Sequence, residues 1–159
     1  MSTELQPQTL DHAGIAARVP HSGSMCLLDT LRGWTAERIE CSATSHRDPA
    51  NPLRCGGQLL APAAIEYAAQ AMALHGTLCA APGSAPRSAS TTGFLASVRA
   101  VRLLVPRLDE VEGELRISAT RLAGDTTQAR YAFSLHDAAG RLLVDGRATV
   151  ILNARPASS

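Results

Sequence analysis

The sequence predicts an α+β fold in which a curled antiparallel sheet wraps around one long central helix. Two observations predict it. The segment 61–80 is rich in alanine and apolar on nearly every side, which is typical of a buried helix. Between residues 93 and 153, the segments 113–122 and 128–136 alternate apolar and polar residues, and turn signals separate the segments, which indicates antiparallel strands. A curled sheet can cover most of such a helix, so we expect the two to pack face to face.

Length and composition favour one domain with a sizeable core. The chain has 159 residues, of which 45% are hydrophobic. We expect the core to span about 16–153, between short flexible tails at 1–12 and 154–159. Aromatic residues make up 3%, too few for stacking on nucleic acid bases, and the net charge of +1 argues against a general polyanion binder. A local basic patch is compatible with this net charge.

Several features predict a cytoplasmic protein. The N-terminal residues are polar and lack the apolar core of a signal peptide. The longest apolar stretch, 59–82, is interrupted by Glu66, Gln70 and His75, which favours a buried helix over a membrane span. The four cysteines show neither Cys-x-x-Cys pairs nor the spacing of metal ligands. We therefore expect reduced thiols and no metal site.

The elements follow in order along the chain. A short apolar run at 25–31 precedes a strand at 34–44, and Pro and Gly residues mark 46–60 as a loop. Pro62 suits the first turn of the helix, where a missing N–H costs nothing. A second loop at 81–90 leads to four strands, with turns at Gly124-Asp125 and at residues 137–140. These strands are predicted at 93–106, 113–122, 128–136 and 141–153.

Glu66, near the start of the predicted helix, is the first candidate catalytic residue. A carboxylate inside a buried helix loses hydration, so its charge must be paired, neutralised or used. The alternative is a structural carboxylate stabilised by the helix dipole. Gln70 lies one turn further on the same face, where it could orient the carboxylate or satisfy a buried polar group.

Two motifs carry a resemblance to a known family. Residues 19–29 read Val-Pro-His-Ser-Gly-Ser-Met-Cys-Leu-Leu-Asp, and residues 65–71 read Ile-Glu-Tyr-Ala-Ala-Gln-Ala. Together they resemble the hotdog-fold 3-hydroxyacyl-acyl carrier protein dehydratases, the first being similar to that family's opening Pro-His segment and the second to its helix with the catalytic Glu. The nearest branch is that of aryl polyene and related type II polyketide clusters, which residues 93–99 also resemble, and the resemblance covers about 16–153.

The chain departs from this family at the usual catalytic base. The mainstream enzymes carry a His in a Gly-His-Phe-Pro-Gly loop before the helix, and residues 46–57 contain no such motif. His21, in the Pro-His segment, is the favoured replacement because that segment lines the substrate tunnel in the family. His46 is the rival, although its neighbours Arg47 and Asp48 indicate a solvated loop residue.

Several other groups have a structural interpretation beside a functional one. Gly56 and Gly57 could bring backbone N–H groups to a thioester oxygen, or form an ordinary turn. Cys55 is expected to be a packed thiol, and His75 a structural residue near the helix end. The arginines around the second loop are mostly solubilising, although some could meet an acidic carrier protein. These are Arg87, Arg99, Arg102 and Arg107.

The resemblance implies dehydration of a 3-hydroxyacyl thioester to a trans-2-enoyl thioester, in fatty acid or aryl polyene and polyketide biosynthesis. His21 would be the base and Glu66 the acid, with Gly56, Gly57 or the helix start as oxyanion donors and Gln70 in the substrate site. The acyl group would arrive on the phosphopantetheine of an acyl carrier protein, with no metal or redox cofactor. We expect a homodimer, or a heterodimer with another hotdog protein. A hotdog thioesterase and a catalytically silent subunit remain alternatives.

Overall fold

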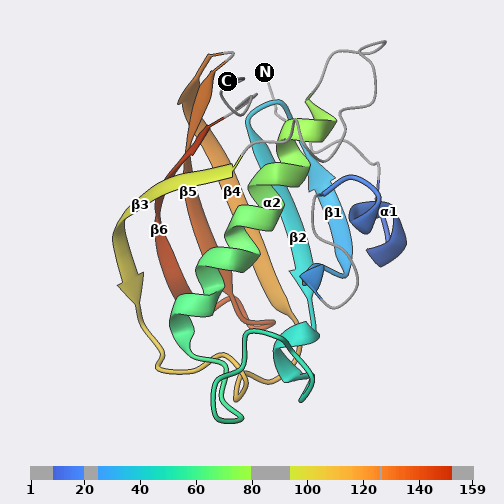
Figure 1. Cartoon of the computed structure of the whole chain (residues 1–159), viewed down its shortest axis with the longest axis vertical. Helices are drawn as coiled ribbons and strands as arrows, with labels where there is room; N and C mark the ends of the chain where they lie inside the picture. Colours follow the sequence, from blue (N-terminus) through green and yellow to red (C-terminus); the bar gives the residue numbers. More distant parts are fainter. Residues whose placement is uncertain (1–8, 20–24, 80–93, 126, 152–159) are drawn as a thin grey trace, which may run out of the picture.

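Six strands form one antiparallel sheet in the order β1-β2-β4-β5-β6-β3, and the long helix α2 lies diagonally across one face of it (Figure 1). The computed structural model describes residues 9–19, 25–79, 94–125 and 127–151. The strands are β1 (Thr30–Trp34), β2 (Arg38–Ala43), β3 (Phe94–Leu103), β4 (Leu115–Gly124), β5 (Gln128–His136) and β6 (Leu142–Ile151). The helices are α1 (His12–Ala16) and α2 (Ala64–Leu78), with 3₁₀ turns at Ser45–Arg47 and Ala61–Ala63.

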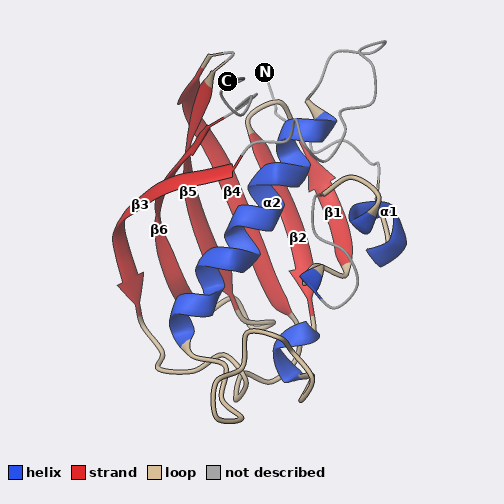
Figure 2. Cartoon of the chain, viewed as in Figure 1, coloured by secondary structure: helices blue, strands red, loops and turns tan. Residues whose placement is uncertain are grey.

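The predicted hotdog fold is confirmed. Figure 2 shows the strands curving around α2, which contacts β2, β3, β4 and β5. Pro62 lies in the 3₁₀ turn that leads into α2, as expected for a residue without an N–H. Neither of the helices within the described residues is long and apolar enough to cross a membrane.

The alternation predicted for the strands is also observed. On β5, Ala129, Tyr131, Phe133 and Leu135 are buried, while the residues between them face away from the core. Cross-strand packing is tight where Gly146 on β6 opposes Phe133, because a Cβ at this glycine would lie 2.8 Å from the Phe133 ring. A side chain at residue 146 would therefore displace a core aromatic ring.

The helix is not buried all round, so that prediction is wrong for the chain by itself. One face of α2 is buried against the sheet, whereas Ile65, Glu66, Ala69, Ala73 and Gly76 are only partly buried. These residues recur at helical spacing and therefore form one flank of the helix. Glu66 sits at the start of this flank and retains access to solvent in the single chain.

Two further differences concern the N-terminal part. The expected strand at 34–44 is a hairpin, because β1 ends at Trp34 and β2 begins at Arg38. The segment predicted as a loose leader ends in helix α1, which Asp11 caps by accepting a hydrogen bond from the Gly14 N–H. The His12 imidazole donates to the Leu28 carbonyl through Nδ1, at 2.9 Å, and ties this helix to the core.

Candidate functional site

Gln70 links Glu66 to the segment that follows the Pro-His motif. Its side chain is fully buried on α2. The Nε2 amide donates to the Met25 carbonyl at 2.7 Å and to Oε1 of Glu66 at 3.3 Å. The Oε1 atom of Gln70 accepts from the Leu27 N–H at 2.8 Å. Gln70 therefore satisfies buried polar groups, one of the two roles considered from the sequence, and it also contacts the carboxylate, whose orientation by Gln70 stays a prediction.

A second group of side chains holds the same segment from the other side. The Ser45 hydroxyl donates to the Leu27 carbonyl at 2.8 Å and lies 2.8 Å from the Tyr67 hydroxyl. Asn51 donates to that phenol oxygen at 3.2 Å. Gln70 on α2 and Ser45, which contacts Tyr67 on the same helix, therefore bind three backbone atoms of residues 25–27 between them. A buried network of this kind restricts the segment to one conformation.

His21, the predicted base, lies outside the described residues, as do Arg87 and the rest of the second loop. Its role therefore stays a prediction. In the sequence it precedes by four positions Met25, the first residue that Gln70 holds. Of the predicted site residues, the structure brings together Glu66 and Gln70.

Gly56 and Gly57 form an exposed tight turn. Both have positive φ values, 59° and 80°, which only glycine adopts easily. Cys55 and Gln58 close the turn by exchanging backbone hydrogen bonds of 2.8 and 3.1 Å. The Gly57 carbonyl accepts from Arg54 at 2.7 Å, so the turn is tied to the loop cluster around that arginine. Cys55 is exposed, which contradicts the expectation of a packed thiol.

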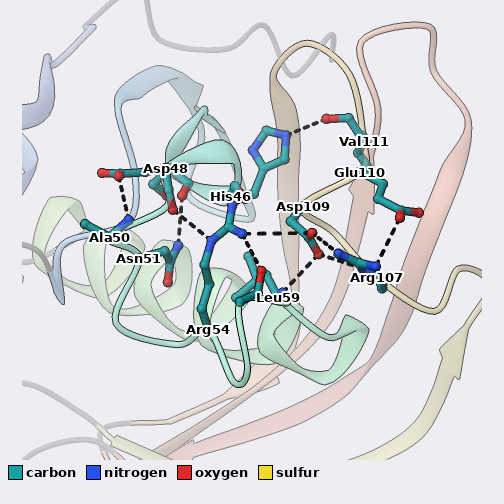
Figure 3. A network of polar contacts seen from close by, with 12 residues as sticks. His46, Asp48, Ala50, Asn51, Arg54, Leu59, Arg107, Asp109, Glu110 and Val111 are labelled. Atoms are coloured by element: carbon teal, nitrogen blue, oxygen red, sulfur yellow. Dashed lines mark hydrogen bonds and ion pairs between the residues drawn. The ribbon is translucent and has the colours of Figure 1, made fainter.

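The expectation that His46 is solvated is wrong, because its imidazole is fully buried. The Nε2–H donates to the Val111 carbonyl at 3.0 Å, whereas Nδ1 has no hydrogen-bond partner (Figure 3). Burial lowers the pKa of His46, with the nearby Arg47 acting in the same direction. The side chain is thus a neutral imidazole packed between two loops.

Arg54 joins those two loops. It donates through Nε, Nη1 and Nη2 to the carbonyls of Asp48, Gly57 and His46 at 2.9, 2.7 and 3.2 Å. Figure 3 shows it beside Asp109, whose carboxylate accepts from the Leu59 N–H at 2.9 Å and from Arg107 at 2.5 Å. The Arg107 guanidinium holds the pKa of Asp109 well below its usual range. These bonds are structural and occupy Arg107, one of the predicted carrier-protein contacts.

Sequence reasoning missed a second buried histidine network, at the far end of α2. His75 is 1% exposed, and its Nε2–H donates to the Thr35 carbonyl at 2.8 Å. Its Nδ1 then accepts from the Tyr131 hydroxyl at 2.7 Å. The signal was present, since His75 lies on the helix and Tyr131 on the inward face of β5. Burial lowers the pKa of His75, and Arg121 adds to the effect.

Acid should weaken the fold just below pH 6.5, because His46 and His75 are buried as neutral imidazoles. Their folded pKa values lie below the usual 6.5. Above that pH neither state binds the proton, and below it only the unfolded state does. The free energy of unfolding should therefore decrease as the pH is lowered below 6.5, by up to about 1.4 kcal/mol per pH unit for each histidine. Urea denaturation between about pH 7.5 and about pH 5.5 measures the slope, clear of the carboxylate range.

His46→Gln tests the assignment. Glutamine can still donate to the Val111 carbonyl but does not titrate, so the slope should become shallower. A variant that keeps the wild-type slope would show that His46 takes no part in this pH dependence.

The described residues contain no cluster of three or more His, Cys, Asp or Glu side chains that could hold a metal ion. The four cysteines are unpaired thiols, as predicted, and burial raises the pKa of Cys41 to about 12. Within the described residues, the candidate site consists of Glu66 and Gln70 on α2 and of the segment 25–27 that Gln70 binds.

A curled six-stranded sheet packed on one long helix defines a hotdog fold. The candidate site of this protein carries a carboxylate in the first turn of that helix. The family model for the ApeP dehydratase matches residues 13–158. The chain belongs to the ApeP-like dehydratase family, which confirms the resemblance inferred from the two motifs. Among curated proteins none matches the chain.

Solved structures share the fold. The dehydratase heterocomplex ApeI:P from Xenorhabdus doucetiae is similar at 25% identity and a TM-score of 0.76, over 89% of this chain and 91% of that one. A thioesterase from Haemophilus influenzae matches with a TM-score of 0.65 and 13% identity, over 98% and 100% of the two chains. A thioesterase from Pseudomonas aeruginosa matches at 0.61 and 16%, over 94% and 99%. The two thioesterases support the fold alone.

Proposed function

We propose that this chain dehydrates 3-hydroxyacyl thioesters carried on an acyl carrier protein, as a step of aryl polyene or related polyketide biosynthesis. One observation carries the proposal. Gln70 contacts Glu66 and also holds residues 25–27, so the helix that carries the acid is bound to the segment that directly follows the Pro-His motif. The chain's membership of the ApeP-like dehydratase family supports the same reaction.

In this reaction the C2–H bond and the C3–O bond of the substrate break, and a C2–C3 double bond forms. His21 takes the C2 proton as general base, and protonated Glu66 gives a proton to the leaving 3-hydroxyl, which departs as water. Negative charge develops on the thioester oxygen meanwhile, and backbone N–H groups at Gly56-Gly57 or at the helix start stabilise it. The contact from Gln70 orients the Glu66 carboxyl group toward the substrate.

The proposal includes a second hotdog chain. The similar Xenorhabdus structure is a heterocomplex of two dehydratase proteins. In the present chain, β3 lies at the edge of the sheet, and the flank of α2 from Ile65 to Gly76 is only partly buried. An open strand edge and an uncovered helix flank are surfaces that pairing buries. The partner is either a second copy or, by analogy with that complex, an ApeI-type protein.

One alternative has specific support. The catalytic loop histidine of the mainstream dehydratases has no counterpart in this chain. His46, from the corresponding loop, is buried against Val111. A silent subunit that completes the site of a catalytic partner would tolerate both features. The hotdog thioesterase has weaker support, since the thioesterases above share the fold at low identity.

Mass spectrometry of 3-hydroxyacyl carrier proteins separates these functions. The purified chain should be assayed alone, with an ApeI-type partner, and with that partner carrying a disabled site. Enoyl product in the last mixture supports the proposal, and free acid identifies a thioesterase. Product that disappears whenever the partner is disabled identifies a silent subunit. Light scattering on the same samples should show a dimer, and a stable monomer in every mixture would contradict the pairing.

A further inference from the structure

The outer face of the sheet, opposite the helix, carries a hollow that the proposed chemistry does not use. Its volume is about 480 Å³, and it lies over β3, β4, β5 and β6. Small residues, Ala100, Ala132 and Gly146, form part of its lining. Hydroxyl and charged side chains from the outward positions of the strands complete it: Ser118, Thr120, Ser134, Arg102, Asp145 and Arg147.

Two arginines oppose each other at the edge of this hollow, and one of them, Arg147, is part of its lining. Arg99 on β3 and Arg147 on β6 are direct cross-strand partners, so their side chains leave the sheet on the same face. Like charges in this arrangement repel each other and destabilise the pair. Both residues are exposed, and neither forms an ion pair with any described residue. Arg130 on β5 pairs with Thr149 and is therefore a diagonal neighbour of Arg147 on the same face. It is likewise exposed and forms no ion pair with any described residue.

The nearby negative charge is already engaged. Asp145 faces Arg102 across the same two strands and accepts from its Nε and Nη2 atoms at 2.9 and 2.5 Å. The pKa of Asp145 is lowered by these hydrogen bonds, so it is a carboxylate at neutral pH. Three further arginines therefore leave this part of the face with excess positive charge. We refer to Arg99, Arg130 and Arg147 as the arginine triad.

The backbone of β3 is distorted in a way that brings its arginines to one face. Residues 99 and 102 are three positions apart and would point to opposite faces of a regular strand. Their partners Arg147 and Asp145 are two apart and share a face. A bulge between Arg99 and Arg102 supplies the extra residue, and within it Ala100 adopts a φ of 53°. Bulges of this kind re-aim side chains, and a non-glycine residue at this φ is strained.

We infer that the hollow and the arginine triad form the docking surface for the acidic face of the acyl carrier protein. The choice of the acyl carrier protein as the partner rests on the proposed function, whereas the choice of this surface rests on its positive charge. Guanidinium groups bind carboxylates in a planar, bidentate manner, and a cluster of them raises the rate of encounter with an acidic protein. Docking of carboxylates would also relieve the repulsion between Arg99 and Arg147. Figure 1 shows β3 ending at the same end of the molecule at which α2, with Glu66 in its first turn, begins.

Charge reversal tests the surface. Arg99→Glu and Arg147→Glu should each weaken binding of a fluorescently labelled apo carrier protein by about tenfold in low salt. Arg116→Glu is the control, because Arg116 is exposed on the outward side of β4, lines no part of the hollow, and is paired with Glu114 instead of belonging to the arginine triad. Its affinity should stay within about twofold of the wild type. Asp145→Asn should strengthen binding, since it frees Arg102, and a merely structural role for these residues would not produce an increase.

The outcome is independent of turnover. A short pantetheine thioester reaches the site without docking, so its turnover should be the same in the wild type and in both charge-reversed variants. Wild-type affinity in Arg99→Glu and Arg147→Glu, or an equal loss in Arg116→Glu, would overturn the docking surface. If the chain binds carrier protein through the arginine triad but turns over no thioester, the docking surface stands and the proposed dehydration fails.

Discussion

Glu66→Gln should abolish most turnover while leaving the fold intact. The amide has the shape of the carboxylic acid but carries no proton that it can give to the leaving hydroxyl. General acid catalysis contributes roughly a hundredfold to ten-thousandfold, so we expect a loss of about a hundredfold or more in kcat. Glu66 is only partly buried, and Gln70, which contacts it, keeps its bonds to Met25 and Leu27, so the stability cost should be small.

The measurement is enoyl thioester formation by the assembled complex, with the partner's own site disabled. Glu112→Gln is the matched control, because Glu112 is exposed in the loop before β4. It should retain wild-type kcat. A well-folded Glu66→Gln complex with wild-type turnover would remove Glu66 from the mechanism, and would favour the silent-subunit alternative.

Periodicity was sufficient to predict β4 and β5, although not the β1–β2 hairpin. The apolar residues at 115, 117 and 119 of β4 and at 129, 131, 133 and 135 of β5 recur at every second position and are buried as expected, whereas Leu122 near the end of β4 is exposed. The helix was predicted correctly as an element but not in its exposure. Its alanines make every side apolar, so the sequence does not distinguish the flank left open by the sheet from the face that packs on it. A sheet of one chain covers only one side of a helix, so the other side stays partly exposed in the single chain.

The candidate site was predictable only where the helix supplied it. Glu66 and Gln70 are four residues apart, and that spacing alone predicts their contact. The bonds from Gln70 to Met25 and Leu27 join residues more than forty positions apart, which no local pattern reveals. His46 was misjudged for a related reason. Arg47 and Asp48 do belong to a polar loop, but adjacent residues of a 3₁₀ turn point in different directions, and His46 is the residue of this turn that is fully buried.

The burial of His46 changes the argument about the catalytic base. Solvation in a polar loop no longer counts against this residue, because its imidazole is buried and lies 3.0 Å from the Val111 carbonyl. What counts against it now is the opposite property. Its side chain is fully buried, and the nitrogen free to accept a proton, Nδ1, is closed off from solvent. A general base must reach the C2 proton of a bound substrate, either directly or through one water molecule.

We therefore expect His21→Ala to lower kcat by roughly a hundredfold or more, the contribution of a general base, with little change in the urea midpoint. His46→Gln should do the reverse. It should retain most turnover but unfold at lower urea, because the packing of the imidazole between the two loops is lost. Both variants should be measured in the assembled complex, for enoyl product and for stability. A His21→Ala protein that keeps its turnover, beside a folded His46→Gln protein that loses it, would transfer the role of base to His46 and require the loop at Val111 to open during catalysis.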